Sequence, residues 1–176
     1  ADAGTVTEDG LNTSFNLTNV GGLTIDAISG SDTLAVQGTA AADTFTISVT
    51  AVTHDSLQGV NAIANVDALA VSGAEAADTF DVTAGAIPIS IDGGDANGAG
   101  DAIAIAAGAN SATFNAGPGT DEGSFAIGGA AGLISFDHME SLTVDGTSVA
   151  GNAATVNGTS ADNDITLTAT ATDDFT

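Results

Sequence analysis

The chain has 176 residues with no Lys or Arg and with 23 Asp and Glu, which gives a formal net charge of −23. This balance argues against nucleic acid and anionic membrane surfaces as partners, because both bind proteins through Lys and Arg. No apolar run approaches the roughly 18 residues that a bilayer-spanning segment needs, and the absence of Cys excludes disulfides and thiolate metal sites.

Apolar residues make up 43% of the chain, and they alternate with polar residues rather than following helical spacing. Alternation with period two predicts strands, and the Gly, Asn and Asp residues between the apolar stretches predict turns. The sequence therefore predicts an all-β protein with a packed core. In chain order, the apolar residues expected to share one face of a strand are Phe15/Leu17, Leu23/Ile25, Leu34/Val36, Phe45/Ile47/Val49, Leu69/Val71, Phe80/Val82, Ile87/Ile89/Ile91, Ile103/Ile105, Phe125/Ile127, Ile134/Phe136, Leu142/Val144 and Ile165/Leu167.

One phrase occurs twice in the chain, at residues 38–47 and again at residues 73–82. Each copy opens with Gly, crosses small residues to Asp, and then alternates polar and apolar residues. Gly38 and Gly73 are 35 residues apart. Self-similarity at a fixed period of about 20–50 residues is typical of solenoids and repeat arrays.

The preferred architecture is a parallel β-helix, in which coils of about 35 residues with three short strands each stack on one another. The chain is then a single repetitive domain, residues 1–176, with tentative units at 1–37, 38–72, 73–107, 108–145 and 146–176. Equivalent residues are expected to stack in columns, namely Leu34 on Leu69 on Ile103, and Phe45 on Phe80 on Phe114. The alternative is a set of β-sandwich modules, since short, evenly spaced strands suit both architectures.

The best candidate for a cation site is the loop Asp92-Gly-Gly-Asp95-Ala-Asn97-Gly-Ala-Gly-Asp101, which offers three carboxylates, one Asn and four glycines. Ca²⁺ takes about six to eight oxygen ligands on a flexible loop, so the loop predicts calcium ligands at Asp92, Asp95, Asn97 and Asp101. Weaker copies of this pattern occur at Asp121 and at Asp164. The alternative interpretation is a polar turn, because Asp, Asn and Gly are also favoured turn residues.

The repeated phrase resembles the calcium-binding repeat of RTX toxins and related secreted proteins. It also resembles the degenerate Gly-Thr-x-x-x-Asp-Thr-Phe repeats of very large acidic bacterial surface proteins, of the S-layer or adhesin type. The resemblance implies a β-solenoid in which aspartates and turn carbonyls hold Ca²⁺ between coils, in a protein secreted to the cell surface. It adds Asp43 and Asp78 to the expected calcium ligands. The Asp–apolar pairs that match are Asp43/Phe45, Asp78/Phe80, Asp101/Ile103 and Asp32/Leu34, with Gly30 matching a family glycine in the last of these.

Two histidines lie near carboxylates, His54 beside Asp55, and His138 between Asp137 and Glu140. Such pairs occur in general acid–base catalysis and in transition-metal sites. Neither histidine has a second His at ligand spacing, and Trp and Tyr, which usually line the clefts of carbohydrate-cleaving β-helices, are absent. Both histidines are therefore interpreted as surface or turn residues, and no catalytic residue is expected.

Together these patterns favour a structural or adhesive protein of the extracellular surface, a calcium-stabilised β-solenoid that assembles head-to-tail with itself into a fibre or layer. Residues 171–176 resemble the start of another copy of the repeated phrase, and an uncapped solenoid end templates further strands. One alternative is a calcium-dependent carbohydrate-binding or polysaccharide-lyase-type β-helix, with glycans as ligands. The other is a salt-adapted acidic protein in which sodium chloride replaces calcium.

Overall fold

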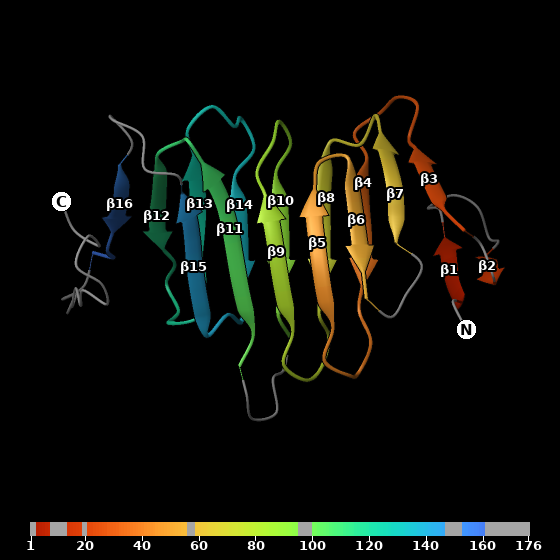
Figure 1. Cartoon of the computed structure of the whole chain (residues 1–176), viewed down its shortest axis with the longest axis horizontal. Helices are drawn as coiled ribbons and strands as arrows, with labels where there is room; N and C mark the ends of the chain where they lie inside the picture. Colours follow the sequence, from red (N-terminus) through yellow and green to blue (C-terminus); the bar gives the residue numbers. More distant parts are fainter. Residues whose placement is uncertain are drawn as a thin grey trace.

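The computed structural model describes residues 3–7, 14–18, 21–55, 59–94, 100–146 and 153–160. Within these residues all regular structure is β (Figure 1), which confirms the all-β prediction. No helix in the described part of the chain is long and apolar enough to cross a membrane. The strands are β1 (Ala3–Thr7), β2 (Ser14–Thr18), β3 (Leu23–Asp26), β4 (Thr33–Gln37), β5 (Thr44–Ser48), β6 (Ala51–His54), β7 (Val60–Ala64), β8 (Ala68–Ser72), β9 (Thr79–Thr83), β10 (Ile89–Asp92), β11 (Ala102–Gly108), β12 (Ala112–Ala116), β13 (Gly123–Ile127), β14 (Ile134–Asp137), β15 (Ser141–Gly146) and β16 (Ala154–Asn157).

Two seven-stranded sheets form two layers that face each other across the core (Figure 1). Sheet I has the order β15-β11-β9-β5-β6-β7-β3, and sheet II has the order β16-β12-β13-β14-β10-β8-β4. Most neighbouring strands are parallel, and the antiparallel pairs within the sheets are β5/β6, β6/β7, β12/β13 and β13/β14. Strands β1 and β2 form a separate antiparallel pair. The fold is therefore a two-layer, largely parallel all-β structure.

The core consists of inward-facing apolar residues that alternate with polar, outward-facing ones along each strand. In β5, for example, Phe45 and Ile47 are fully buried while Thr44 and Thr46 are exposed. Buried apolar residues from both sheets form one cluster. Since burying one large apolar side chain contributes about 1.5–3 kcal/mol, this shared core explains why the two sheets stay together.

Two of the predicted column contacts are confirmed by the strand register. Leu34 pairs with Leu69 in parallel strands of sheet II, and Phe45 pairs with Phe80 in parallel strands of sheet I. The two phenylalanine rings stack with centroids 5.1 Å apart and planes inclined by 2°.

The predicted third members of both columns are wrong. Ile103 pairs with Phe80 rather than with Leu69, and Phe114 pairs with Phe125 in an antiparallel hairpin rather than with Phe80. Both errors have the same cause, which is that successive stretches of chain do not contain equal numbers of strands.

Among the described strands the chain passes from sheet II to sheet I four times, from β4 to β5, β8 to β9, β10 to β11 and β14 to β15, and the described ends of these passages lie at the lower edge of Figure 1. We call the stretch between successive passages a rung. One rung contains β5–β8 and the next contains β9 and β10 alone. Strands β6 and β7 widen sheet I, and β12 and β13 widen sheet II. The predicted uniform coil of three strands is therefore wrong, because the repeated phrase marks the passages between the sheets and not whole coils.

Candidate functional site

An acidic residue ends each of the four passages from sheet II to sheet I. Asp43 immediately precedes β5, Asp78 precedes β9, Asp101 precedes β11 and Glu140 precedes β15. Because these four strands are parallel neighbours in sheet I, the four residues form a row that we call the acid column. Its first three members are buried, with exposed fractions of 2%, 1% and 0% for Asp43, Asp78 and Asp101.

The carboxylates of Asp78, Asp101 and Glu140 each accept the backbone N–H of the acidic residue in the preceding rung. The N–H of Asp43 donates to Asp78 Oδ1 at 2.7 Å, and the N–H of Asp78 donates to Asp101 Oδ1 at 2.6 Å. The N–H of Asp101 donates to Glu140 Oε2 at 2.5 Å. A carboxylate oxygen thus does at the corner what a backbone carbonyl does within a strand, and it satisfies a donor that would be costly to bury unpaired.

Glycine opens each of the first three corners because a side chain there would collide with the column. A Cβ on Gly38, Gly73 or Gly93 would lie within 2.7 Å of the Asp Oδ2 of its own rung and of a backbone carbonyl oxygen of the next rung. The repeated phrase is therefore the sequence of a corner that buries a carboxylate against glycine backbone. In the last corner His138 takes the place of the glycine, with a left-handed φ of 55°.

The second oxygens of the carboxylates have different surroundings. Asp43 Oδ2 accepts the backbone N–H of Thr39 at 2.6 Å and the Thr39 hydroxyl at 3.1 Å. Asp78 Oδ2 and Asp101 Oδ2 are buried, and neither has a hydrogen-bond partner among the described residues. Buried polar groups are almost always hydrogen-bonded. The corners of Asp78 and Asp101 therefore differ from the corner of Asp43, where Thr39 donates to the second oxygen.

The pKa values of the column follow from these surroundings. Burial, followed by neighbouring negative charges, raises the pKa of Asp78 and Asp101 above the ordinary value. For Asp43, burial is the largest single influence and acts in the same direction, but hydrogen bonds from Thr39 and the charge of His54 outweigh it and lower the pKa. Relative to an ordinary Asp, the surroundings thus stabilise the charged form of Asp43 and the neutral forms of Asp78 and Asp101.

His54 at the end of β6 lies against the column, so its interpretation as a surface or turn residue is wrong. Its side chain is 2% exposed, with Nε2 at 3.2 Å from Asp43 Oδ1 and Nδ1 at 3.5 Å from Asp55 Oδ1. Ligand atoms of these three residues lie within 4.8 Å of one another. Each ring nitrogen lies beside a different carboxylate, so the imidazole is paired with an acidic side chain on both sides.

His138 is a half-exposed turn residue, which agrees with the sequence interpretation. Its Nδ1 lies 2.8 Å from Asp92 Oδ1. This hydrogen bond, together with the charges of Asp137 and Asp121, raises the pKa of His138 above its ordinary value. The imidazole therefore ties the outer end of β10 to the corner that follows β14.

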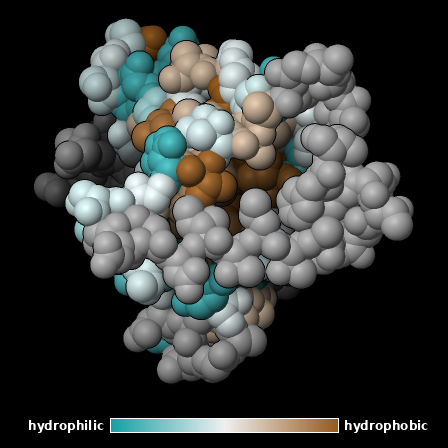
Figure 2. Space-filling model, turned by 90° about the vertical axis from the view of Figure 1, so that its left-hand side faces the viewer, coloured by the Kyte–Doolittle hydropathy of each residue, from teal (hydrophilic) through white to brown (hydrophobic). Residues whose placement is uncertain are grey.

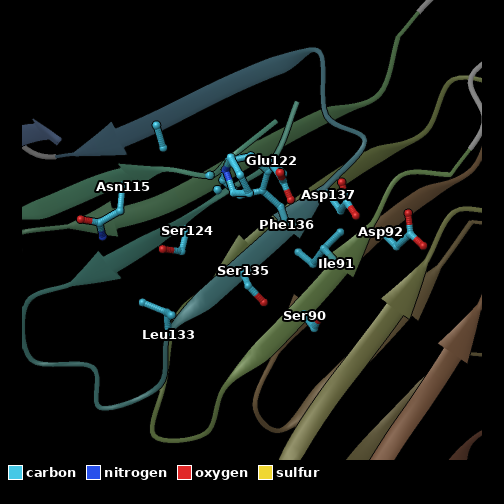
Figure 3. Close-up of a pocket in the computed structure, with 14 residues that line it drawn as sticks. Ser90, Ile91, Asp92, Asn115, Glu122, Ser124, Leu133, Ser135, Phe136 and Asp137 are labelled. Carbon is cyan, nitrogen blue, oxygen red and sulfur yellow. The ribbon is translucent and has the colours of Figure 1, made fainter. Parts of the chain in front are cut away.

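A groove of about 570 Å³ crosses the outer face of sheet II (Figure 3). Polar side chains from neighbouring strands line it in a row, and the carboxylates of Asp92, Asp137 and Glu122 lie along one side of it. Such hydroxyl, amide and carboxylate groups are suited to a hydrated cation or a polyhydroxy ligand. The row consists of Ser90, Ser135, Ser124 and Asn115, which are paired across β10, β14, β13 and β12.

The predicted calcium ligands separate into three groups. Asp43, Asp78 and Asp101 belong to the acid column, whereas Asp92 lies on the outer face beside the groove. Asp121 is near the same face, where its carbonyl accepts the N–H of Met139 at 2.9 Å. Asp95, Asn97 and Asp164 lie outside the described residues.

The two ends of the predicted calcium loop have different partners. Asp92 Oδ1 contacts the imidazole of His138, and Asp101 Oδ1 accepts the N–H of Asp78. Calcium binding stays a prediction. Asp78 Oδ2 and Asp101 Oδ2, which have no hydrogen-bond partner among the described residues, face glycine backbone, so the more exposed carboxylates beside the groove are the better place for a hydrated cation.

Sequence reasoning missed two members of this arrangement. Glu140 had a usable signal, since it precedes Leu142 and Val144 at the same spacing at which Asp43 precedes Phe45 and Ile47. His54 had none, because its burial arises from the antiparallel pairing of β6 with β5, which places it opposite Phe45.

Comparisons with protein families, with curated proteins and with solved structures find no match for this chain. Its function must therefore be inferred from the geometry of its sheets, its acid column and its groove.

Proposed function

We propose that the chain is a segment of a parallel β-solenoid in a structural or adhesive protein of the cell exterior. Every rung contributes strands to both sheets, and equivalent strands of successive rungs pair in parallel. The acid column joins the rungs at their corners. These features support a stack that lengthens by the addition of further rungs.

The observation that carries the proposal is that the apolar columns run to exposed positions at one end of the stack. Leu142 continues the column of Phe45, Phe80 and Ile103, yet it is 39% exposed, and Val144 beside it is 38% exposed. Figure 2 views this end of the stack and shows apolar side chains at the surface near its centre.

The same end carries the outermost strands of both sheets, β15 and β16. Among the described residues each of these strands is paired along one edge. Val156 of β16 is 54% exposed. An open strand edge with apolar residues is a template for another strand, and the occupant we propose is the first rung of a second copy, joined head to tail.

Calcium has the role of controlling charge in this proposal. Two copies that each carry 23 acidic and no basic residues repel each other, and salt shortens the range of this repulsion to about 8 Å at physiological ionic strength. A divalent ion bound between carboxylates removes repulsion at contact distance as well. The carboxylates of Asp92 and Asp137 beside the groove are about half exposed, so such ions can reach them.

We expect the purified chain to form linear assemblies in millimolar calcium and to dissociate when calcium is chelated. Leu142→Glu should abolish assembly, because it places a charge in the apolar contact. Thr143→Glu is the matched control, since it adds the same charge on the outer face of the same strand and should assemble like the wild type. Sedimentation velocity and negative-stain microscopy measure both effects, with sodium chloride at matched ionic strength as the salt control.

Three results would contradict the proposal in distinguishable ways. A monodisperse monomer in calcium would remove head-to-tail assembly, and equal assembly in sodium chloride would replace calcium by general screening. A monomer that binds a polysaccharide in a calcium-dependent manner would favour the second candidate, a carbohydrate-binding module. The polar row along the groove is the observation that speaks for that candidate.

A further inference from the structure

The two ends of the stack match each other in strand direction. Sheet I ends in β15 on one side and in β3 on the other, and sheet II ends in β16 and β4. Each sheet contains two antiparallel steps, β5/β6 and β6/β7 in sheet I and β12/β13 and β13/β14 in sheet II. Because two reversals cancel, β15 runs in the same direction as β3, and β16 runs in the same direction as β4. A second copy shifted along the stack would therefore continue both sheets with parallel pairs.

The two sheets are also equally wide. Both have seven strands, because β6 and β7 add two strands to sheet I while β12 and β13 add two to sheet II. Among the described residues, each of the four outermost strands is paired along one edge. Strands β1 and β2 pair with each other in a separate sheet. Each end of the stack thus presents two strand edges whose backbone groups a strand of another molecule can pair with.

One row of apolar residues crosses each sheet from edge to edge. In sheet I the row runs from Leu23 on β3 to Val144 on β15, and every strand between them contributes one paired apolar residue. In sheet II the row runs in the same way from Leu34 on β4 to Val156 on β16. The ends of both rows are incompletely covered, since Leu23 and Leu34 are partly buried while Val144 and Val156 are 38% and 54% exposed.

We propose that β15 and β16 of one copy pair in parallel with β3 and β4 of the next, with Val144 opposite Leu23 and Val156 opposite Leu34. The inference rests on the proposed function, because it names the strands and the register of the head-to-tail contact. In this register both apolar rows continue through the junction, and the four row ends are removed from water. Parallel ladders of hydrogen bonds form along both edges at the same time.

Charge distinguishes this register from its nearest competitor in sheet I. With Val144 opposite Leu23, the outer-face residue Asp145 lies opposite Thr24. A slip of two residues keeps the same side chains facing the core, but in one direction it places Asp145 opposite Asp26. Like charges directly opposite each other destabilise a strand pair, so this slip is disfavoured.

The space beside β3 favours the proposed register as well. It places Leu142 opposite Gly21, where no heavy atom lies within 4 Å of the Cβ position, so the leucine side chain has room. A slip of two residues in the other direction would place Leu23 opposite Gly146 and would lose the apolar contact of Leu23 with Val144.

Engineered disulfides test the pairing cleanly, because the chain has no Cys of its own. Thr33 and Thr155 occupy exposed positions of β4 and β16, at opposite edges of sheet II. Within one copy the strand spacings between them amount to about 29 Å, which is far beyond the reach of a disulfide. In the proposed contact they lie opposite each other in neighbouring strands, about 4.8 Å apart, which a disulfide can bridge.

The variants are oxidised in millimolar calcium and analysed by non-reducing denaturing electrophoresis. A mixture of Thr33→Cys and Thr155→Cys should give covalent dimers, the double variant should give a ladder of longer chains, and neither single variant alone should cross-link. Ala126→Cys, on the outer face of the inner strand β13, is the matched control and should not cross-link with Thr155→Cys. Ala35→Cys tests the register, and it should react less than Thr33→Cys because diagonal neighbours lie about 7–8 Å apart.

The pair Thr24→Cys and Asp145→Cys tests the sheet I contact in the same way. Cross-linking of Thr155→Cys with itself would show a tail-to-tail dimer and overturn the proposal, and a preference for Ala35→Cys over Thr33→Cys would overturn the register. Assembly without cross-linking of either pair would overturn the strand pairing while leaving the proposed function intact. If the wild type does not assemble at all, both fail.

Hydrogen exchange on the wild type tests the pairing without any substitution. On assembly the amides of β3, β4, β15 and β16 should exchange more slowly, because pairing protects the N–H groups of an edge. Amides of the inner strands β9 and β10 should be unchanged and serve as the control. Slower exchange at other surfaces, with no change in the four outermost strands, would place the contact elsewhere and overturn the proposal.

Discussion

Gly73 shows how little room a corner leaves for a side chain. Its Cα faces the carboxylate of Asp78 and the carbonyl of Gly93, so the glycine is required by close approach of other atoms. The same relation holds at Gly38 with Asp43. The conformational freedom of glycine is secondary at these two positions, since neither has a left-handed φ.

We expect Gly73→Ala to lower the free energy of unfolding by about 1–3 kcal/mol, the usual cost of forcing extra atoms into a packed site. Gly21→Ala is the control, because no heavy atom lies within 4 Å of the Cβ position at Gly21. That variant should stay within about 0.5 kcal/mol of the wild type. Urea denaturation measures both, and equal effects of the two substitutions would contradict the packing explanation.

At the scale of strands, the columns of apolar residues align one rung with the next. Phe80 is fully buried between Phe45 and Ile103 in neighbouring parallel strands. Phe114, in the β12–β13 hairpin, is only partly buried and packs against the edge of the core. Both residues are phenylalanines, so substitutions at the two positions compare the stability contributed by the same side chain at the centre of a column and in a hairpin.

Replacement of Phe80 by Ala should cost about 3–5 kcal/mol, because a large buried side chain is lost and the surrounding rungs cannot close the cavity. Phe114→Ala should cost distinctly less, since part of that ring already contacts solvent. Chemical denaturation of both variants gives the comparison. A larger loss for Phe114→Ala would show that the hairpin and not the column anchors the core.

The sequence allowed the corners to be predicted better than the strands between them. Phe45 and Phe80 could be assigned to one column, because both follow a glycine and an aspartate at identical spacing. Strands β6 and β7 could not be foreseen as a hairpin within sheet I, because their short apolar alternation resembles that of any strand. For the same reason the burial of His54 beside Asp43 could not be predicted.

The role of the aspartates could not be predicted from sequence patterns either. An Asp after a Gly-rich turn is equally consistent with a calcium ligand and with an acceptor of a backbone N–H. The hydrogen bond between the Asp43 N–H and Asp78 Oδ1 joins residues 35 positions apart, and pairing at that distance depends on the register of the sheets.

At the scale of the whole molecule, all the formal charges are negative and therefore repel one another. The 23 acidic residues have no Lys or Arg to pair with, and the two histidines already contact carboxylates. Net charge far from zero destabilises a compact state through self-repulsion. Stability should therefore depend on ionic strength more strongly than it does in a protein with mixed charges.

We expect the Tm to rise between about 0.01 M and 1 M sodium chloride, as the Debye length falls from about 30 Å to 3 Å. Calorimetry on the Leu142→Glu variant measures this without interference from assembly. A neutral osmolyte cannot screen charge and serves as the control. A Tm that stays constant or falls with salt would show that repulsion between carboxylates does not limit the stability of the fold.

The hydrogen bonds between rungs all point the same way along the stack, so they give the molecule a direction, which we call its vector. At each step from Asp43 to Glu140 the amide belongs to the earlier rung and the carboxyl group to the later one. Two molecules related by a two-fold axis would oppose their vectors, whereas a simple translation or screw keeps them aligned. Contacts of the second kind do not close on themselves, so growth at the Leu142 end would have no built-in stopping length.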